Sequence, residues 1–293
     1  MENIEIFFCG LSKNNYESLK KNIDFLLLFQ KKSKFKNINI LIVDSNSKDG
    51  SKELLQETAD KYRFFEVIHK DDLNFVDSRV ERIKICRNLC LHFIEQNSKK
   101  NLVVYIPCDT DFFLFSKTTF SKLDSLISKV IKYRKPNAVF PVSQPFYYDI
   151  FALRAPGWLN INSQLVVSRL KKYVRIGSFL FNYIFIFRYQ LSPEQIKSRN
   201  FKILSAFGGI GIYNISNLNL KVQKYEINNK FKEWYSEHIF FNQYFEQLEI
   251  DTSWVVDSPK EHIMFKSLNL KSKSKYFLKT FKEDIRSFFK KKI

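Results

Sequence analysis

Hydrophobic and polar positions follow two different periods along the first half of the chain. Short apolar runs predict strands, and apolar residues at every third or fourth position predict helices. The predicted strands span residues 3–10, 37–45, 64–72, 101–111 and 137–143. The predicted helices span residues 15–33, 51–62, 78–97 and 118–134. Alternating strands and helices indicate βαβ units, so we expect an α/β fold with a mostly parallel sheet flanked by helices.

The pattern is less regular in the second half. Residues 144–165 read as a loop, and residues 166–190 mix Lys and Arg with an aromatic, apolar stretch. Residues 206–213, "AFGGIGIY", predict a tight turn into a strand, and residues 233–248 predict a helix. There is no internal repeat.

Carboxylates stand where the predicted strands end: Asp44, Asp71, Asp72, Asp109 and Asp111. In parallel sheets ligands bind outside the carboxyl ends of the strands, so we expect these side chains to cluster along one edge. Side chains alternate in an extended segment, so Asp109 and Asp111 should point the same way. Mg²⁺ or Mn²⁺ suits such a pair, since it prefers one or two carboxylates plus substrate phosphates. The alternative is a pair of solvated loop carboxylates or a helix cap.

The charge balance changes the range of partners. The chain has 48 Lys and Arg against 30 Asp and Glu, a net charge of +18. Such a surplus favours nucleotides, nucleic acid or an anionic membrane. Residues 265–293 carry ten basic and two acidic residues, hence +8. A hydrophobic content of 45% excludes wholesale disorder.

The C-terminal tail, residues 266–293, has aromatic and aliphatic residues at helical spacing among its basic ones. This pattern predicts a basic amphipathic helix suited to an anionic membrane surface. The apolar segment "FLFNYIFIF" is expected to dip alongside it. The alternative is a terminal helix that packs its Phe face on the domain. The apolar positions are Phe277, Phe281, Ile285, Phe288 and Phe289.

The cysteines and the N-terminus bear on the compartment. Cys9, Cys86, Cys90 and Cys108 form no CxxC pair and sit in apolar contexts, so we expect buried, reduced thiols. "MENIEIFFCG" lacks a signal-peptide pattern, and no apolar run reaches about 18 residues. We expect a cytoplasmic protein, peripheral on the inner membrane face if the tail binds lipid.

The stretch "LIVDSNSKDGS", residues 41–51, resembles the first nucleotide-binding motif of family-2-like glycosyltransferases, "VDNGSTDGS". It departs from that pattern at Asn46, which stands before Ser47 where the family has Gly before Ser. The Asp-Thr-Asp after the fourth strand resembles the DxD motif of the same superfamily, the GT-A nucleotide-sugar transferases. The resemblance implies that Asp44 binds the base, and that Asp109 and Asp111 hold the ribose and a metal on the diphosphate. A turn and helix cap is the alternative for Asp44.

Other residues join the predicted donor site by position. Arg79, Arg82 and Arg87 lie broadly on one helical face, which could meet phosphates or could simply be solvated. Glycines at 208, 209 and 211 allow close backbone approach to a ligand. The predicted donor-binding residues are Asp44, Asn46, Asp72, Arg79, Arg87, Asp109, Gly208 and Gly209.

Three stretches resemble a narrower group, the capsule-associated mannosyltransferases and their bacterial relatives. They are "RVERIKICRN", "YYDIFALRAPGW" and "AFGGIGIY" with "SEHIFFN" downstream. By resemblance to inverting family members, Glu237 is expected to be the general base, with a helix-start Glu as the alternative. In a retaining enzyme no such base is required, and Glu237 or His238 would bind substrate instead. We also expect substrate contacts from Asp149, Arg154 and His238, although Asp149 and Arg154, which stand among apolar residues, could form a buried ion pair. His262 resembles the late His that completes the metal shell in many GT-A enzymes, and a structural His is the alternative.

These features favour a metal-dependent glycosyltransferase with Mn²⁺ or Mg²⁺ as cofactor. Its partners would be a nucleoside diphosphate sugar and a saccharide or lipid-linked acceptor in surface glycan assembly. We expect one domain over residues 1–265, with a nucleotide-binding half, 1–115, and an acceptor-side half, 116–265. A sugar-phosphate nucleotidyltransferase would want a Gly-rich loop with Arg after strand one, where this chain has "CGLSKNNYESLK". A nucleic-acid-binding protein fits the charge, but no such motif is present, and no nucleic acid is expected.

Overall fold

The structure is a computed structural model. It describes residues 3–99, 102–133, 135–173, 177–228, 230, 235–267, 275, 278–279 and 281–282. The predicted amphipathic tail helix therefore falls almost wholly outside the described residues.

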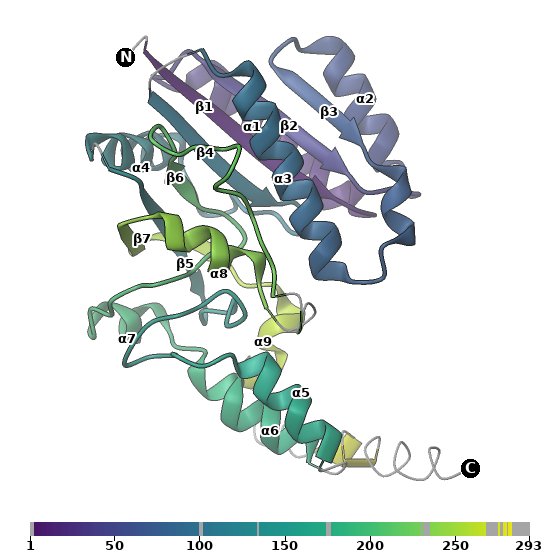
Figure 1. The fold of residues 1–293 in the computed structure, drawn as a ribbon, viewed down its shortest axis with the longest axis vertical. Coiled ribbons are helices and arrows are strands. Elements are labelled where there is room, and N and C mark those ends of the chain that lie inside the picture. The colour runs from purple at the N-terminus through teal and green to yellow at the C-terminus, as the bar shows by residue number, and fades with distance from the viewer. Residues whose placement is uncertain are drawn as a thin grey trace.

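Seven strands form one mixed sheet in the order β3-β2-β1-β4-β6-β5-β7 (Figure 1). Neighbours among β3, β2, β1 and β4 are parallel, β6 runs antiparallel to β4 and β5, and β5 is parallel to β7. This arrangement, with helices on the sheet, confirms the predicted fold class. The strands are β1 (Ile4–Ser12), β2 (Ile38–Asp44), β3 (Phe65–His69), β4 (Leu102–Asp109), β5 (Asn137–Gln144), β6 (Ile212–Asn214) and β7 (Gln247–Asp257).

The helices of the first half begin and end close to the predicted positions. The side chain of Ser78 accepts a hydrogen bond from the Glu81 amide and so caps α3 at its N-terminus. The helices are α1 (Tyr16–Lys32), α2 (Ser51–Lys61), α3 (Arg79–Asn97), α4 (Phe120–Lys132), α5 (Ser163–Tyr173), α6 (Ser178–Phe185), α7 (Pro193–Lys197), α8 (Glu237–Phe241) and α9 (Lys260–Ser267), with 3₁₀ turns η1 (Asp71–Phe75), η2 (Phe187–Tyr189) and η4 (Asn242–Tyr244).

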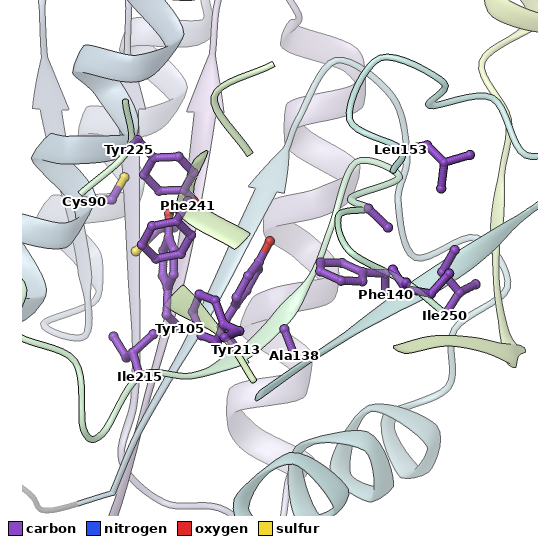
Figure 2. Close-up of a cluster of buried hydrophobic side chains, with 14 of the residues drawn as sticks. Cys90, Tyr105, Ala138, Phe140, Leu153, Tyr213, Ile215, Tyr225, Phe241 and Ile250 are labelled. Atoms are coloured by element: carbon purple, nitrogen blue, oxygen red, sulfur yellow. Dashed lines mark hydrogen bonds between the residues drawn. The ribbon is translucent and has the colours of Figure 1, made fainter. Parts of the chain in front are cut away.

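Two apolar cores lie on opposite faces of the sheet. Along β1, Ile6 and Phe8 belong to the core beneath α1 and α4, whereas Phe7 and Cys9 belong to the core beneath α3 and α8. This follows from the alternation of side chains along a strand. Figure 2 shows part of the second core, where aromatic rings from β4, β6 and α8 meet.

The four cysteines are buried and none is in a disulfide, which confirms the prediction of reduced thiols. Burial raises the pKa of the Cys86 thiol to about 12, so this thiol stays protonated at neutral pH.

The helix predicted over residues 233–248 is wrong for most of its length. Helix α8 is confined to Glu237–Phe241, and η4 follows it. The sequence also missed β7, which pairs with β5 from Asn137 opposite Gln247 onward. From Gln247 onward, pairing with β5 and burial of Trp254 and Val256 stabilise a strand, so a helix cannot continue past η4.

Helices α5 and α6 pack against each other and form a hairpin that the sequence did not predict. In Figure 1 this α5–α6 hairpin lies at the end of the molecule farthest from β1, β2 and β3. The chain leaves α6 through η2 and returns toward the sheet. The α5–α6 hairpin is therefore connected to the part of the molecule that carries the candidate active site described below. Within the described residues, no helix has the length and apolar character to cross a membrane.

Candidate active site

Two cavities meet at the carboxyl end of β4. The smaller, of about 360 Å³, lies among the ends of β1, β2 and β4 and the start of α3. The larger, of about 530 Å³, extends toward α8, α9 and the α5–α6 hairpin. Both are lined by Arg79, Ile83, Asp109 and Asp111. The predicted sheet edge therefore carries a divided cleft with the DxD carboxylates at the division.

The backbone around the DxD is held by hydrogen bonds on both sides. Strand β4 ends at Asp109, whose amide donates to the carbonyl of Gly209 at 2.7 Å. The buried Thr110 donates through Oγ1 to the Leu11 carbonyl at 2.6 Å and accepts from Asn15 Nδ2 at 2.7 Å. These bonds fix the turn that brings Asp109 and Asp111 to the same cavities.

Arg87 lies behind the cleft rather than in it. Its side chain is fully buried and lines neither cavity, although we predicted it as a donor contact. The guanidinium donates to Asp109 Oδ1 at 2.6 Å, and its Nε lies 4.0 Å from Glu237 Oε1. It also lies over the Phe207 ring, 5.1 Å from the centroid. Arg87 thus connects the DxD to the predicted general base.

Burial shapes the acidity of these carboxyls. Desolvation raises the pKa of Asp109 to about 7 against the opposing effect of Arg87, and the nearby Asp111 carboxylate adds to the rise. Burial likewise raises the pKa of Glu237, and Arg87 again opposes it. The Glu237 carboxyl therefore has the elevated basicity that a general base requires.

The carboxylate oxygens of the DxD are suitable ligands for a hard divalent cation. Asp109 and Asp111 present carboxylate oxygens to both cavities, and Mg²⁺ or Mn²⁺ commonly takes its other ligands from phosphates and water. The described part of the chain holds no cluster of three or more His, Cys, Asp or Glu that could bind a metal alone. His262 lines the larger cavity and stacks on Tyr148 at 5.4 Å between ring centroids.

Glu237 and His238 open α8 and line the larger cavity. Nε2 of His238 lies 3.3 Å from Glu237 Oε1, and the imidazole stacks on Phe207 at 3.7 Å between centroids. Burial lowers the pKa of His238 well below its ordinary value, so the ring is neutral. Neither ring nitrogen has a hydrogen-bond partner among the described residues. His238 is therefore placed to hydrogen-bond a bound molecule or water.

Asp44 shapes its own loop. Its buried carboxylate accepts from the Ser47 amide at 3.1 Å and from the Ser47 hydroxyl, and His69 Nδ1 lies 3.9 Å away. Its neighbours Val43 and Ser45 line the smaller cavity, whereas Asp44 does not. Asn46 has φ of 63°, a conformation that Asn tolerates better than most residues. This explains how Asn serves where the family pattern has Gly.

The expectation that all five strand-end carboxylates cluster is wrong for two of them. Asp71 pairs with Lys52 at 2.5 Å, and Asp72 pairs with Lys70 at 2.8 Å, both at the exposed η1 turn. Neither lines either of the two cavities, because the chain turns away after β3.

Asp149 lines the larger cavity and is held by the amides of Gly208 and Ala152, at 2.9 and 3.2 Å. The alternative of a buried ion pair with Arg154 is not seen. Arg154 donates instead to the carbonyls of Phe151 and Leu153 and does not line the cavity. Desolvation lowers its pKa to about 10.

The turn at Gly208 and Gly209 packs closely against neighbouring side chains and does not face an open cavity. Gly208 and Gly209 both have positive φ, and a Cβ at Gly209 would lie 2.8 Å from the Tyr148 hydroxyl and from the Phe112 ring. These glycines therefore allow the turn to pack against β4, through the bond to Asp109.

Two polar residues of the larger cavity come from the hairpin: Gln164 of α5 and Asn182 of α6. Sequence reasoning missed both, because only the hairpin's tertiary placement brings them to the cavity. Glu261, adjacent to His262, also lines it and could have been found from its neighbour.

Residues 11–95 match the family model described as glycosyl transferase family 2. This segment runs from the end of β1 through most of α3 and includes the "VDSNSKDGS" motif. The match confirms the predicted resemblance for this part of the chain. No curated protein sequence matches the chain.

Solved structures similar to this chain include a fragment of S. aureus TarS, with 11% identity, a TM-score of 0.45, and coverage of 89% of this chain and 62% of the fragment. Another is mannosyl-3-phosphoglycerate synthase from Rubrobacter xylanophilus, with 11% identity, a TM-score of 0.40, and coverage of 98% and 74%. A third is glucosyl-3-phosphoglycerate synthase from Mycobacterium tuberculosis in complex with UDP, with 10% identity, a TM-score of 0.42, and coverage of 92% and 74%. At these values the fold assignment rests on the sheet order itself.

Proposed function

We propose that this chain, whose residues 11–95 match glycosyl transferase family 2, transfers a sugar from a nucleoside diphosphate donor to an acceptor hydroxyl. The observation that carries the proposal is the meeting of two cavities at Asp109 and Asp111. A donor with a nucleotide at one end and a sugar at the other needs such a divided site. Its diphosphate would lie between the two cavities, beside both carboxylates and Arg79.

The residues then have separate roles. Asp109 and Asp111 would hold Mn²⁺ or Mg²⁺, which supplies charge neutralisation of the leaving diphosphate. Glu237, with its raised pKa, would accept the proton of the acceptor hydroxyl. Arg87 keeps Asp109 and Glu237 in fixed relation, and His238 and Asp149 face the transferred sugar or acceptor. Base recognition by Asp44 and a metal contact from His262 stay predictions.

The wider role is also a proposal. The resemblance to capsule-associated mannosyltransferases supports a hexosyl donor and a saccharide or lipid-linked acceptor in surface glycan assembly. The basic tail supports a peripheral place on the inner membrane face, where such acceptors are presented.

A thermal-shift panel with UDP, GDP, CDP and dTDP, each with and without Mn²⁺, tests the donor site. A ligand that binds only the folded chain raises the melting temperature by mass action. One nucleotide should stabilise the wild type only with Mn²⁺ present, and Asp109→Asn/Asp111→Asn should abolish that shift.

Asp60→Asn is the matched control, since Asp60 lies on α2 and bonds Gln56 outside both cavities. It should shift like the wild type. If no nucleotide stabilises the wild type, or if the double variant shifts as the wild type does, the donor-site proposal is wrong.

A further inference from the structure

The outer face of the α5–α6 hairpin exposes apolar side chains. Leu180 is 51% exposed and Tyr183 is 47% exposed. They are three residues apart on α6 and so lie on one face of the helix. Asn182, which lines the larger cavity, falls on the opposite side. The same helix therefore presents one face to the active-site cavity and an apolar face to the outside.

The sequence of α6 is unusual for a helix with so little burial. Residues 179–187, "FLFNYIFIF", contain one polar residue and no charge. Not one of the described side chains from Leu180 to Phe185 is fully buried. A helix that is apolar around its circumference is ordinarily enclosed by protein or lipid.

Charge around the hairpin points to an anionic surface. Between Asp149 and Glu194 the chain has six Arg or Lys residues and no Asp or Glu. Among these basic residues, Arg169, Lys171, Lys172 and Arg188 are exposed. Exposed Leu and Tyr beside exposed basic residues are the composition of an interfacial membrane contact, in which Tyr sits at the headgroup level.

We propose that the α5–α6 hairpin docks on an anionic lipid bilayer. Leu180 and Tyr183 enter the boundary between headgroups and acyl chains, and Lys172 and Arg188 contact lipid phosphates. The residues that the proposal uses belong to α5, α6 and η2, and none of them comes from residues 266–293.

Docking has a consequence for the acceptor that rests on the proposed function. Gln164 and Asn182 form the hairpin wall of the larger cavity, so docking holds that wall at the bilayer. The acceptor class that reaches Glu237 from there is a lipid-linked one, because its glycan enters the cavity while its lipid stays in the membrane.

Vesicle partitioning of the full chain tests the docking. Vesicles that contain phosphatidylglycerol should bind the wild type, and vesicles of phosphatidylcholine alone should bind it much more weakly. Leu180→Ser/Tyr183→Ser should lower the partition coefficient by about tenfold or more, because two side chains that would be partly buried in the bilayer lose their apolar surface. Lys172→Glu/Arg188→Glu should lower it on anionic vesicles only.

Leu28→Ser/Val222→Ser is the matched control, because these residues are 48% and 72% exposed elsewhere on the surface. It should partition like the wild type. Fluorescence adds a local readout in a chain that also carries Trp234→Phe: Leu180→Trp should be quenched by brominated lipid and Leu28→Trp should not, while Trp158 and Trp254 are buried.

Several outcomes would overturn the docking. One is equal partitioning of the Leu180→Ser/Tyr183→Ser variant and the wild type. Another is a concentration-dependent dimer that Leu180→Ser abolishes, which would assign the face to a second copy. Binding of random duplex DNA through Lys172 and Arg188, without vesicle binding, would assign it to nucleic acid.

The design separates this inference from the proposed function. Asp109→Asn/Asp111→Asn should bind vesicles like the wild type even as it loses the nucleotide shift. Vesicle binding without any nucleotide shift in the wild type keeps the docking and rejects sugar transfer. A nucleotide shift without vesicle binding does the reverse.

Discussion

The two walls of the larger cavity are built in different ways. The sheet wall carries Asp109, Glu237 and His238 on strand and helix ends, with Arg87 buried behind them. The hairpin wall carries Gln164 and Asn182, uncharged side chains on helices that bury little. If the proposed function holds, the difference teaches that the reacting groups lie where charge pairs and a packed core fix their positions. Substrate selection would then fall to the hairpin, whose side chains have the fewest packing constraints.

The largest expected effect is on the sheet wall, with Glu237→Gln. Loss of the general base should lower kcat by about 10²- to 10⁴-fold. Because burial raises the pKa of Glu237, the acid limb of the wild-type pH–rate profile should lie above the ordinary Glu value, with activity lost as pH falls through it. Steady-state kinetics across pH measure both.

The raised pKa of Glu237 also predicts how this carboxyl changes the stability of the fold with pH. A carboxyl whose folded-state pKa is raised stabilises the fold at low pH and loses that contribution as pH rises through the raised value. Glu237→Gln should therefore melt no lower than the wild type at neutral pH. A clear drop in its melting temperature would show that the ionised carboxylate stabilises Arg87 instead.

The next largest effect is expected from Arg87→Met, which should lower the free energy of unfolding. Removing the buried cation leaves Asp109 and Glu237 without their shared partner, and breaking such a pair costs about 3–5 kcal/mol of unfolding free energy. Urea unfolding measures the loss. Gln56→Met on the exposed surface of α2 is a control that should stay within about 0.5 kcal/mol.

A leucine pair extends the comparison to the two helices α4 and α6. Leu126 of α4 is 1% exposed, so Leu126→Ala should cost about 2–5 kcal/mol. Leu180→Ala on the outer face of α6 should change the unfolding free energy by no more than about 0.5 kcal/mol in the absence of lipid. A large loss at Leu180 would mean that the hairpin face is covered by protein.

The smallest effect should come from the hairpin wall itself. Asn182→Ala removes one polar contact with the bound substrate, worth about 0.5–1.5 kcal/mol, so KM should rise by about 2- to 10-fold. The value of kcat should hold, because Asn182 is not part of the Arg87-centred charge network. A fall in kcat equal to that of Glu237→Gln would contradict the division of labour between the walls.

Local sequence signals predicted the first half of the fold well. Strands β1, β2 and β4 bury both faces, so their apolar runs are unambiguous, and Ser78 marks the start of α3. The DxD was found because carboxylates at the end of a buried strand are conspicuous. The family pattern at residues 41–51 predicted the segment that the family match covers.

The second half depends on contacts between distant segments. Strand β7 forms because the chain pairs with β5 from Gln247 onward, and the pattern of apolar residues does not predict that pairing. Asn182 reaches the cavity only through the packing of the hairpin. Arg87 was read as a solvent-facing phosphate ligand because helical spacing does not show that the Asp109 and Glu237 carboxylates draw it inward.

The burial of all four cysteines gives the chain a practical property. Thiol reagents attack the thiolate, and burial holds the Cys86 and Cys108 thiols protonated, with both raised in pKa. A single cysteine introduced at Leu180 would therefore be the reactive position among these thiols, with the native ones left in place. A label could therefore be attached at residue 180 alone. It would report on contact with a bilayer at the proposed docking surface.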